Sequence, residues 1–152
     1  MMLQLGALLF ATAAHVGARP DACQILTKKE ISAVQGETYS DTKLTPRDGG
    51  SQCFYQLPTF TKSVSVDVIR GSGKEFWDQN FERSEEAEEK SRPPVRVEGV
   101  GDEAFWAGSK VAGSLYVRKG DAVLRVSVGG PGTEAEKMAK SKRLALKALR
   151  RL

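Results

Sequence analysis

The first eighteen residues of the chain lack any acidic or basic side chain, and charge begins only at Arg19. This apolar run ends in small residues, which is typical of a secretory signal that is cleaved after Ala18. The run lacks the basic flank of a standard signal, so a buried N-terminal helix is the alternative. It is also shorter than the roughly 20 apolar residues that cross a membrane. We therefore predict a signal peptide over 1–18 and no transmembrane segment.

Histidine is almost absent, because the one copy in the chain, His15, lies inside the predicted leader. A mature protein without imidazole lacks the usual base of Ser-His and Cys-His catalysis and the commonest zinc ligand. The chain has no P-loop, and Gly99-Val-Gly-Asp102 lacks the third glycine and the helix of a dinucleotide-binding motif. We therefore expect no metal, no cofactor and no enzyme of these classes.

Cysteine is nearly as scarce, with Cys23 and Cys53 as the two copies in the chain. They allow one bridge, which would close a loop of about 30 residues and is typical of an oxidising compartment. Their spacing differs from the Cys-x-x-Cys pattern of redox enzymes. Two buried thiols are the alternative. Together with the leader, the pair favours a secreted or periplasmic protein.

Positive charge gathers at the C-terminal end of a chain whose net charge is +4. A helix is predicted after Thr133, with acidic residues in its first turn and basic residues beyond, as the helix dipole favours. The basic residues are Lys137, Lys140, Lys142, Arg143, Lys147, Arg150 and Arg151. A solvated face is one interpretation, and association with an anionic envelope surface is another, although the helix lacks anchoring Trp and Phe. No nucleic-acid-binding motif occurs.

The spacing of apolar residues predicts an α+β fold. Alternation predicts strands over 51–57, 63–70, 95–100, 103–107, 114–119 and 122–128. A capping box of Thr27 and Glu30 begins a helix over Lys28–Gln35, and a second helix starts near Lys74. The element order is α-β-β-α-β-β-β-β-α, which predicts an antiparallel sheet of about five to six strands with helices packed on it.

Aromatic residues supply the best hint of a binding surface. They lie in or near the predicted strands and turns, and the possible surface consists of Tyr55, Trp77, Phe105, Trp106 and Tyr116. Most such side chains fill a core, but any that line a groove would suit a small apolar ligand.

A pair of adjacent carboxylates, Asp102 and Glu103, gives an enzymatic alternative. Carboxylates beside aromatic residues occur in sugar-processing sites, so a carboxylate-dependent hydrolase is possible. Neighbours on an extended chain point to opposite faces, however, which favours a simple turn.

Four segments resemble small secreted bacterial domains of unknown function. These segments are Asp21-Ala-Cys-Gln-Ile-Leu-Thr27 with Glu30 and Val34-x-Gly36, Cys53-x-Tyr55, Val100-Gly-Asp-Glu-Ala-Phe-Trp106 and Leu115-Tyr-Val-Arg-Lys-Gly120. Such domains are similar to the PsbP-like α/β sandwich and often occur on actinobacterial lipoproteins. The resemblance implies pairing of Cys23 with Cys53 and no catalytic residues. This chain departs from the pattern because Pro20-Asp21-Ala22 does not form a lipobox before Cys23.

These observations predict an exported, non-enzymatic α+β domain over 19–152 that binds a small ligand or a cell-envelope partner. They define neither the ligand nor the oligomeric state.

Overall fold

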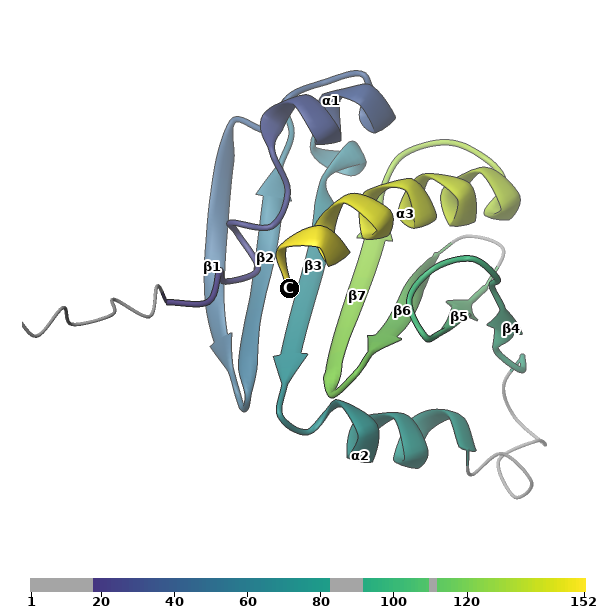
Figure 1. The fold of residues 1–152 in the computed structure, drawn as a ribbon. Coiled ribbons are helices and arrows are strands. Elements are labelled where there is room, and N and C mark those ends of the chain that lie inside the picture. The colour runs from purple at the N-terminus through teal and green to yellow at the C-terminus, as the bar shows by residue number, and fades with distance from the viewer. Residues whose placement is uncertain (1–17, 83–91, 110–111) are drawn as a thin grey trace, which may run out of the picture.

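A computed structural model describes residues 18–82, 92–109 and 112–152, so the predicted leader lies outside the described residues except for Ala18. Seven antiparallel strands form one sheet in the order β1-β2-β3-β7-β6-β5-β4 (Figure 1). The strands are β1 (Asp41–Arg47), β2 (Gly50–Gln56), β3 (Val64–Arg70), β4 (Val95–Arg96), β5 (Glu103–Gly108), β6 (Gly113–Lys119) and β7 (Ala122–Val128). The helices are α1 (Lys28–Gln35), α2 (Gly73–Trp77) and α3 (Glu134–Ala148). This confirms the α+β class.

Short helical turns complete the described chain. They are η1 (Phe60–Lys62), the π-helical turn η2 (Asp78–Glu82) that continues α2, and η3 (Leu149–Arg151) that continues α3. The capping boxes of Thr27 with Glu30 and of Thr133 with Glu136 are both formed. The acidic part of the predicted second helix beyond residue 82 lies outside the described residues.

The sheet has more strands than the sequence predicts. The missed strand is β1, whose residues are mostly exposed and therefore lack the apolar alternation that marks a strand. The predicted strand over 95–100 is too long, because β4 ends at Arg96 and the chain then turns through Gly99 and Gly101. Both glycines have positive φ angles, 78° and 60°, which other residues rarely adopt.

One face of the sheet forms the main core. Alternation places Val64, Val66 and Val68 of β3 and Leu124 and Val126 of β7 on this face, and all five are fully buried. The face is covered by α1 and α3, with α3 lying across the strands (Figure 1). Ile31 of α1 and three residues of α3 bury their side chains against it; the latter are Leu144, Ala145 and Ala148.

The opposite face is divided into two parts. Near β5 and β6 it is covered by α2, whose aromatic side chains pack on it. Across β2, β3 and β7 it is polar and centred on Arg125, which pairs with Asp67 and donates to Ser65 Oγ at 2.9 Å and Ser114 Oγ at 3.0 Å. These hydrogen bonds connect β3, β6 and β7 on this face.

The end of the chain is tied to α1 by a bidentate ion pair. Two nitrogens of Arg151 donate to the two carboxylate oxygens of Glu30, each at 2.9 Å, and one of them also donates to Ile25 O. Burial alone raises the pKa of Glu30, but the hydrogen bonds from Arg151 and from the Thr27 N–H outweigh it, so the pKa lies below the ordinary value. The ionised form of Glu30 is therefore favoured by folding.

Replacing Glu30 with Gln is expected to remove an acid-sensitive part of the stability. Because the folded pKa is lowered, the stabilisation is present above pH 4.5 and is lost as pH falls through the folded value. At neutral pH the variant should be about 1–2 kcal/mol less stable. Urea unfolding from pH 7 to pH 3 measures the free energy of unfolding of both proteins. A difference between them that is as large at pH 3 as at pH 7 would contradict the prediction.

Candidate functional site

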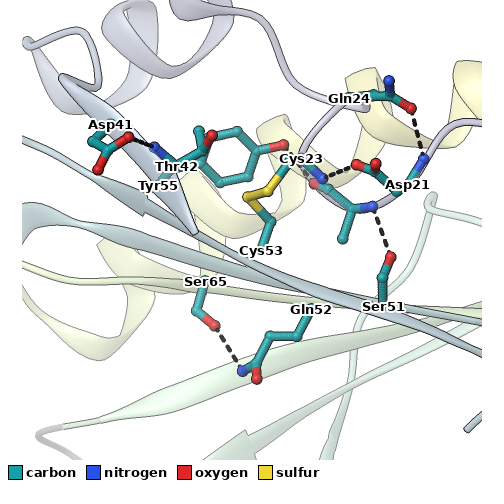
Figure 2. The surroundings of a disulfide bond; sticks show 11 residues. Asp21, Cys23, Gln24, Asp41, Thr42, Ser51, Gln52, Cys53, Tyr55 and Ser65 are labelled. Carbon is teal, nitrogen blue, oxygen red and sulfur yellow. Dashed lines mark hydrogen bonds between the residues drawn. A yellow bond between two sulfur atoms is a disulfide. The ribbon is translucent and has the colours of Figure 1, made fainter. Parts of the chain in front are cut away.

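The predicted disulfide is present between Cys23 and Cys53, which are 30 residues apart. It fastens the segment before α1 to the middle of β2 (Figure 2). Two hydrogen bonds flank it: Ala22 N donates to Ser51 Oγ at 2.9 Å, and the Tyr55 hydroxyl donates to Ala22 O. Burial raises the pKa of Tyr55, which keeps this hydroxyl protonated as a donor. These contacts give the disulfide a structural role.

The five aromatic residues of the predicted surface are split between the two faces of the sheet. Tyr55 and Trp106 lie in the core beneath the helices, at 0% and 2% exposure. Trp77, Phe105 and Tyr116 meet on the opposite face under α2. Since Tyr55, Trp77 and Trp106 are all buried, they are not part of an open surface, and Phe105 and Tyr116 are half-buried.

The second group is a small aromatic core. Trp77, Phe81, Phe105 and Tyr116 pack with ring centroids 4.6–5.7 Å apart, and the Phe76 ring lies 6.2 Å from Tyr116. The Trp77 indole donates from Nε1 to Glu103 Oε2 at 2.6 Å. Phe76 and Phe81, which the surface prediction left out, therefore belong to this cluster. Their positions next to Trp77 and four residues after it place all three on one side of a helix, and this spacing could have identified them from the sequence.

The two adjacent carboxylates point to different partners. Asp102 Oδ2 accepts from the Gly120 N–H at 2.7 Å and lies 3.7 Å from Arg118, which holds the turn between β6 and β7. Glu103 instead accepts from Trp77 on the α2 side. Each carboxylate thus has a structural partner, and the two do not face a shared substrate position. Within the described part of the chain, no three His, Cys, Asp or Glu residues gather to hold a metal ion.

A groove of about 580 Å³ lies between the edge strand β4 and the first half of α3. We call it the β4–α3 groove, and it is lined by Arg92, Val95, Val97, Glu134, Ala135, Met138, Ala139 and Lys142. Its volume lies within the range of about 300–1,000 Å³ typical of small-molecule sites. Its walls are mostly apolar, and Val95 is 41% exposed at the strand side. The sequence does not reveal this groove, since its two walls are far apart along the chain.

The charges of the β4–α3 groove lie near its two ends. Glu134, at the start of α3, is paired with Arg92. Lys142 lies eight residues later, about 12 Å along the helix axis. Among the residues that the structure describes, Lys142 has no hydrogen-bond or ion-pair partner. The groove therefore combines an apolar floor with a cation that is unpaired within the described ranges.

A second depression of about 360 Å³ lies at the ends of β3 and β7, beside Phe54 and Gly129. Its floor is polar, but the hydroxyls there already have protein partners: Ser127 Oγ donates to Gly113 O, and Ser65 Oγ accepts from Arg125. It therefore offers a ligand less apolar contact than the β4–α3 groove.

No helix in the described ranges has the length and apolar character needed to span a bilayer. No family model matches the chain, and no curated protein matches it. A solved structure of a GTP-binding regulator from Thermotoga maritima is similar over 79% of this chain and 88% of that one, with 13% identity and a TM-score of 0.42. A similarity at this level does not indicate a ligand or an activity for this chain.

Proposed function

We propose that this protein is an exported, non-enzymatic binding domain, and that the β4–α3 groove holds a small amphiphilic ligand. The ligand has an apolar body, which lies against Val95, Val97 and Met138, and an anionic end, which pairs with Lys142. The observation that carries the proposal is the combination of an apolar groove of ligand size with a lysine that has no ion-pair partner among the described residues. The charge-free leader and the disulfide support export.

The groove suits a small molecule better than an extended peptide. A peptide would add to the outer edge of β4, but this strand is two residues long and follows Pro93 and Pro94. Short length, proline and a charged residue such as Arg96 are the features by which sheets prevent another strand from pairing. The edge therefore offers a peptide few backbone groups, whereas the groove offers contacts with side chains.

The two alternative functions, a carboxylate-dependent hydrolase and association with the envelope surface through α3, have less support. A hydrolase at Asp102 and Glu103 requires carboxylates that converge, whereas here they bond to Gly120 and Trp77. Envelope association through α3 requires an apolar anchor among its basic residues, and Leu146, at 41% exposure, is the one large apolar side chain of α3 that is exposed. We therefore keep the groove as the proposed site.

Filling the groove is expected to weaken binding strongly. We would titrate the purified, disulfide-bonded protein with dansylaminoundecanoic acid and follow dansyl emission. Ala139→Trp places a large side chain in the groove and should weaken binding by roughly tenfold or more, since about 1.4 kcal/mol gives tenfold. Lys142→Gln removes the cation and should weaken binding about threefold to fivefold.

Two matched variants on the exposed face of α3 control for nonspecific effects. Lys147→Gln makes the same change as Lys142→Gln outside the groove, and Lys147→Trp adds an indole there while removing a cation; both should bind as the parent does. A dansyl-labelled alkylamine, with the charge reversed, should bind more weakly than the acid. Equal affinity of all variants, or preference for the amine, would refute the groove as the site.

A further inference from the structure

The outer edge of β1 is a second feature that the proposed function does not use. β1 is the terminal strand of the sheet, so the backbone groups on its outer side pair with no strand of the described chain (Figure 1). It is seven residues long, unlike β4 at the other end of the sheet. Its central residue, Leu44, is 45% exposed. A long, exposed edge with an apolar centre is a site for pairing with another strand.

The charges of β1 are complementary to a second copy of itself. In an antiparallel pair centred on Leu44, Asp41 lies opposite Arg47 of the second copy, and Arg47 lies opposite its Asp41. Both side chains occupy the face away from the helices, because their partners on β2 are Gln56 and Gly50. Directly opposed charges of opposite sign stabilise a strand pair, and like charges destabilise it.

Other registers are less favourable. Moving the centre of the pair by one residue along β1 shifts the pairing by two positions, which keeps every side chain on its own face. The alternatives to Leu44 are therefore pairs centred on its neighbours. Centring the pair on Lys43 places two lysines opposite each other, and centring it on Thr45 places Lys43 opposite Arg47. The register centred on Leu44 is the one of these three that places no cation opposite another.

Two residues of β1 oppose pairing but do not prevent it. Pro46 has no N–H, so the pair loses one possible hydrogen bond in each copy. Lys43 is a residue type that protects edges, but in this register it lies opposite Thr45. Arg47 also donates to Gln52 Oε1 in its own chain, and a guanidinium has further donors for Asp41 of the second copy.

We propose that two copies of this chain associate through β1, in antiparallel register centred on Leu44, into a continuous sheet. The association is weak, since one strand pair is smaller than a standard interface, and it forms at roughly 100 μM protein.

Charge reversal at the two ends of β1 tests this proposal. We would measure association of the purified, disulfide-bonded protein by sedimentation equilibrium. Asp41→Arg or Arg47→Asp alone should weaken association by roughly tenfold, because each turns two attractive pairs into repulsive ones. The double variant restores opposite charges and should return to within about threefold of the parent. Lys147→Asp makes the same charge change as Arg47→Asp on α3 and should have no effect.

Hydrogen exchange of the β1 amides gives a second readout that does not depend on the variants. The Leu44 amide should become more protected from exchange as the parent protein is concentrated. As a control for the variants, circular dichroism should show that each of them is folded. A parent that stays monomeric throughout, a dimer that ignores both single reversals, or a folded double variant without recovery would each overturn the proposal.

Discussion

Removing the disulfide, by Cys23→Ser together with Cys53→Ala, is expected to lower the free energy of unfolding by about 3.5 kcal/mol. The bridge closes a 30-residue loop, and cutting it gives the unfolded chain more conformations. The segment before α1 would then be held by the Ala22 contacts with Ser51 and Tyr55, by the burial of Ile25 and Leu26, and by hydrogen bonds from Arg70 and Arg151. Urea unfolding of both proteins at neutral pH, each fitted with its own slope, measures the difference.

Dithiothreitol provides the matched control for this prediction. Reduction should destabilise the parent by a similar amount and leave the cysteine-free variant unchanged. A loss below about 1 kcal/mol in both tests would show that the core alone holds this segment, and the bridge would then have little structural role.

Truncating the aromatic core on the second face is expected to have an effect of about the same size. Trp77→Ala should cost about 3–5 kcal/mol, since it leaves a cavity among Phe81, Phe105 and Tyr116. It also leaves Glu103 without the indole donor. Trp77→Phe keeps much of the ring volume and should cost about 1–2 kcal/mol, mostly the hydrogen bond. Thermal and urea unfolding distinguish the two values.

A binding assay distinguishes this structural role of Trp77 from a role in ligand binding. Trp77→Phe should bind dansylaminoundecanoic acid as tightly as the parent, because Trp77 is buried on the face opposite the β4–α3 groove. Loss of binding in a Trp77→Phe variant that is still folded at the assay temperature would instead place the ligand at the aromatic cluster.

Local signals account for the parts of the fold that the sequence could predict. The alternating valines of β3 and the capping box of Thr27 with Glu30 involve neighbours in the chain, so they are readable without tertiary information. Because the chain has two cysteines, Cys23 and Cys53, one disulfide within the chain was possible. Thr133 and the acidic residues after it likewise marked the start of α3.

Tertiary packing decided the features that the sequence could not predict. β1 has no apolar alternation, because it lies at the edge and buries little. Tyr55 and Trp106 resembled Phe105 and Tyr116 in the sequence, yet the pleat places the two pairs on opposite faces. The β4–α3 groove is lined by both Val95 and Met138, and whether they line one groove depends on where α3 crosses the sheet.

The most direct test of the proposed function is a ¹⁵N-HSQC titration of the protein with dodecanoate. The account predicts amide shift changes concentrated at residues 95–97 and 134–142, with the largest near Met138 and Lys142. Changes concentrated at Trp77, Phe105 and Tyr116, or no saturable change at any residue, would contradict it.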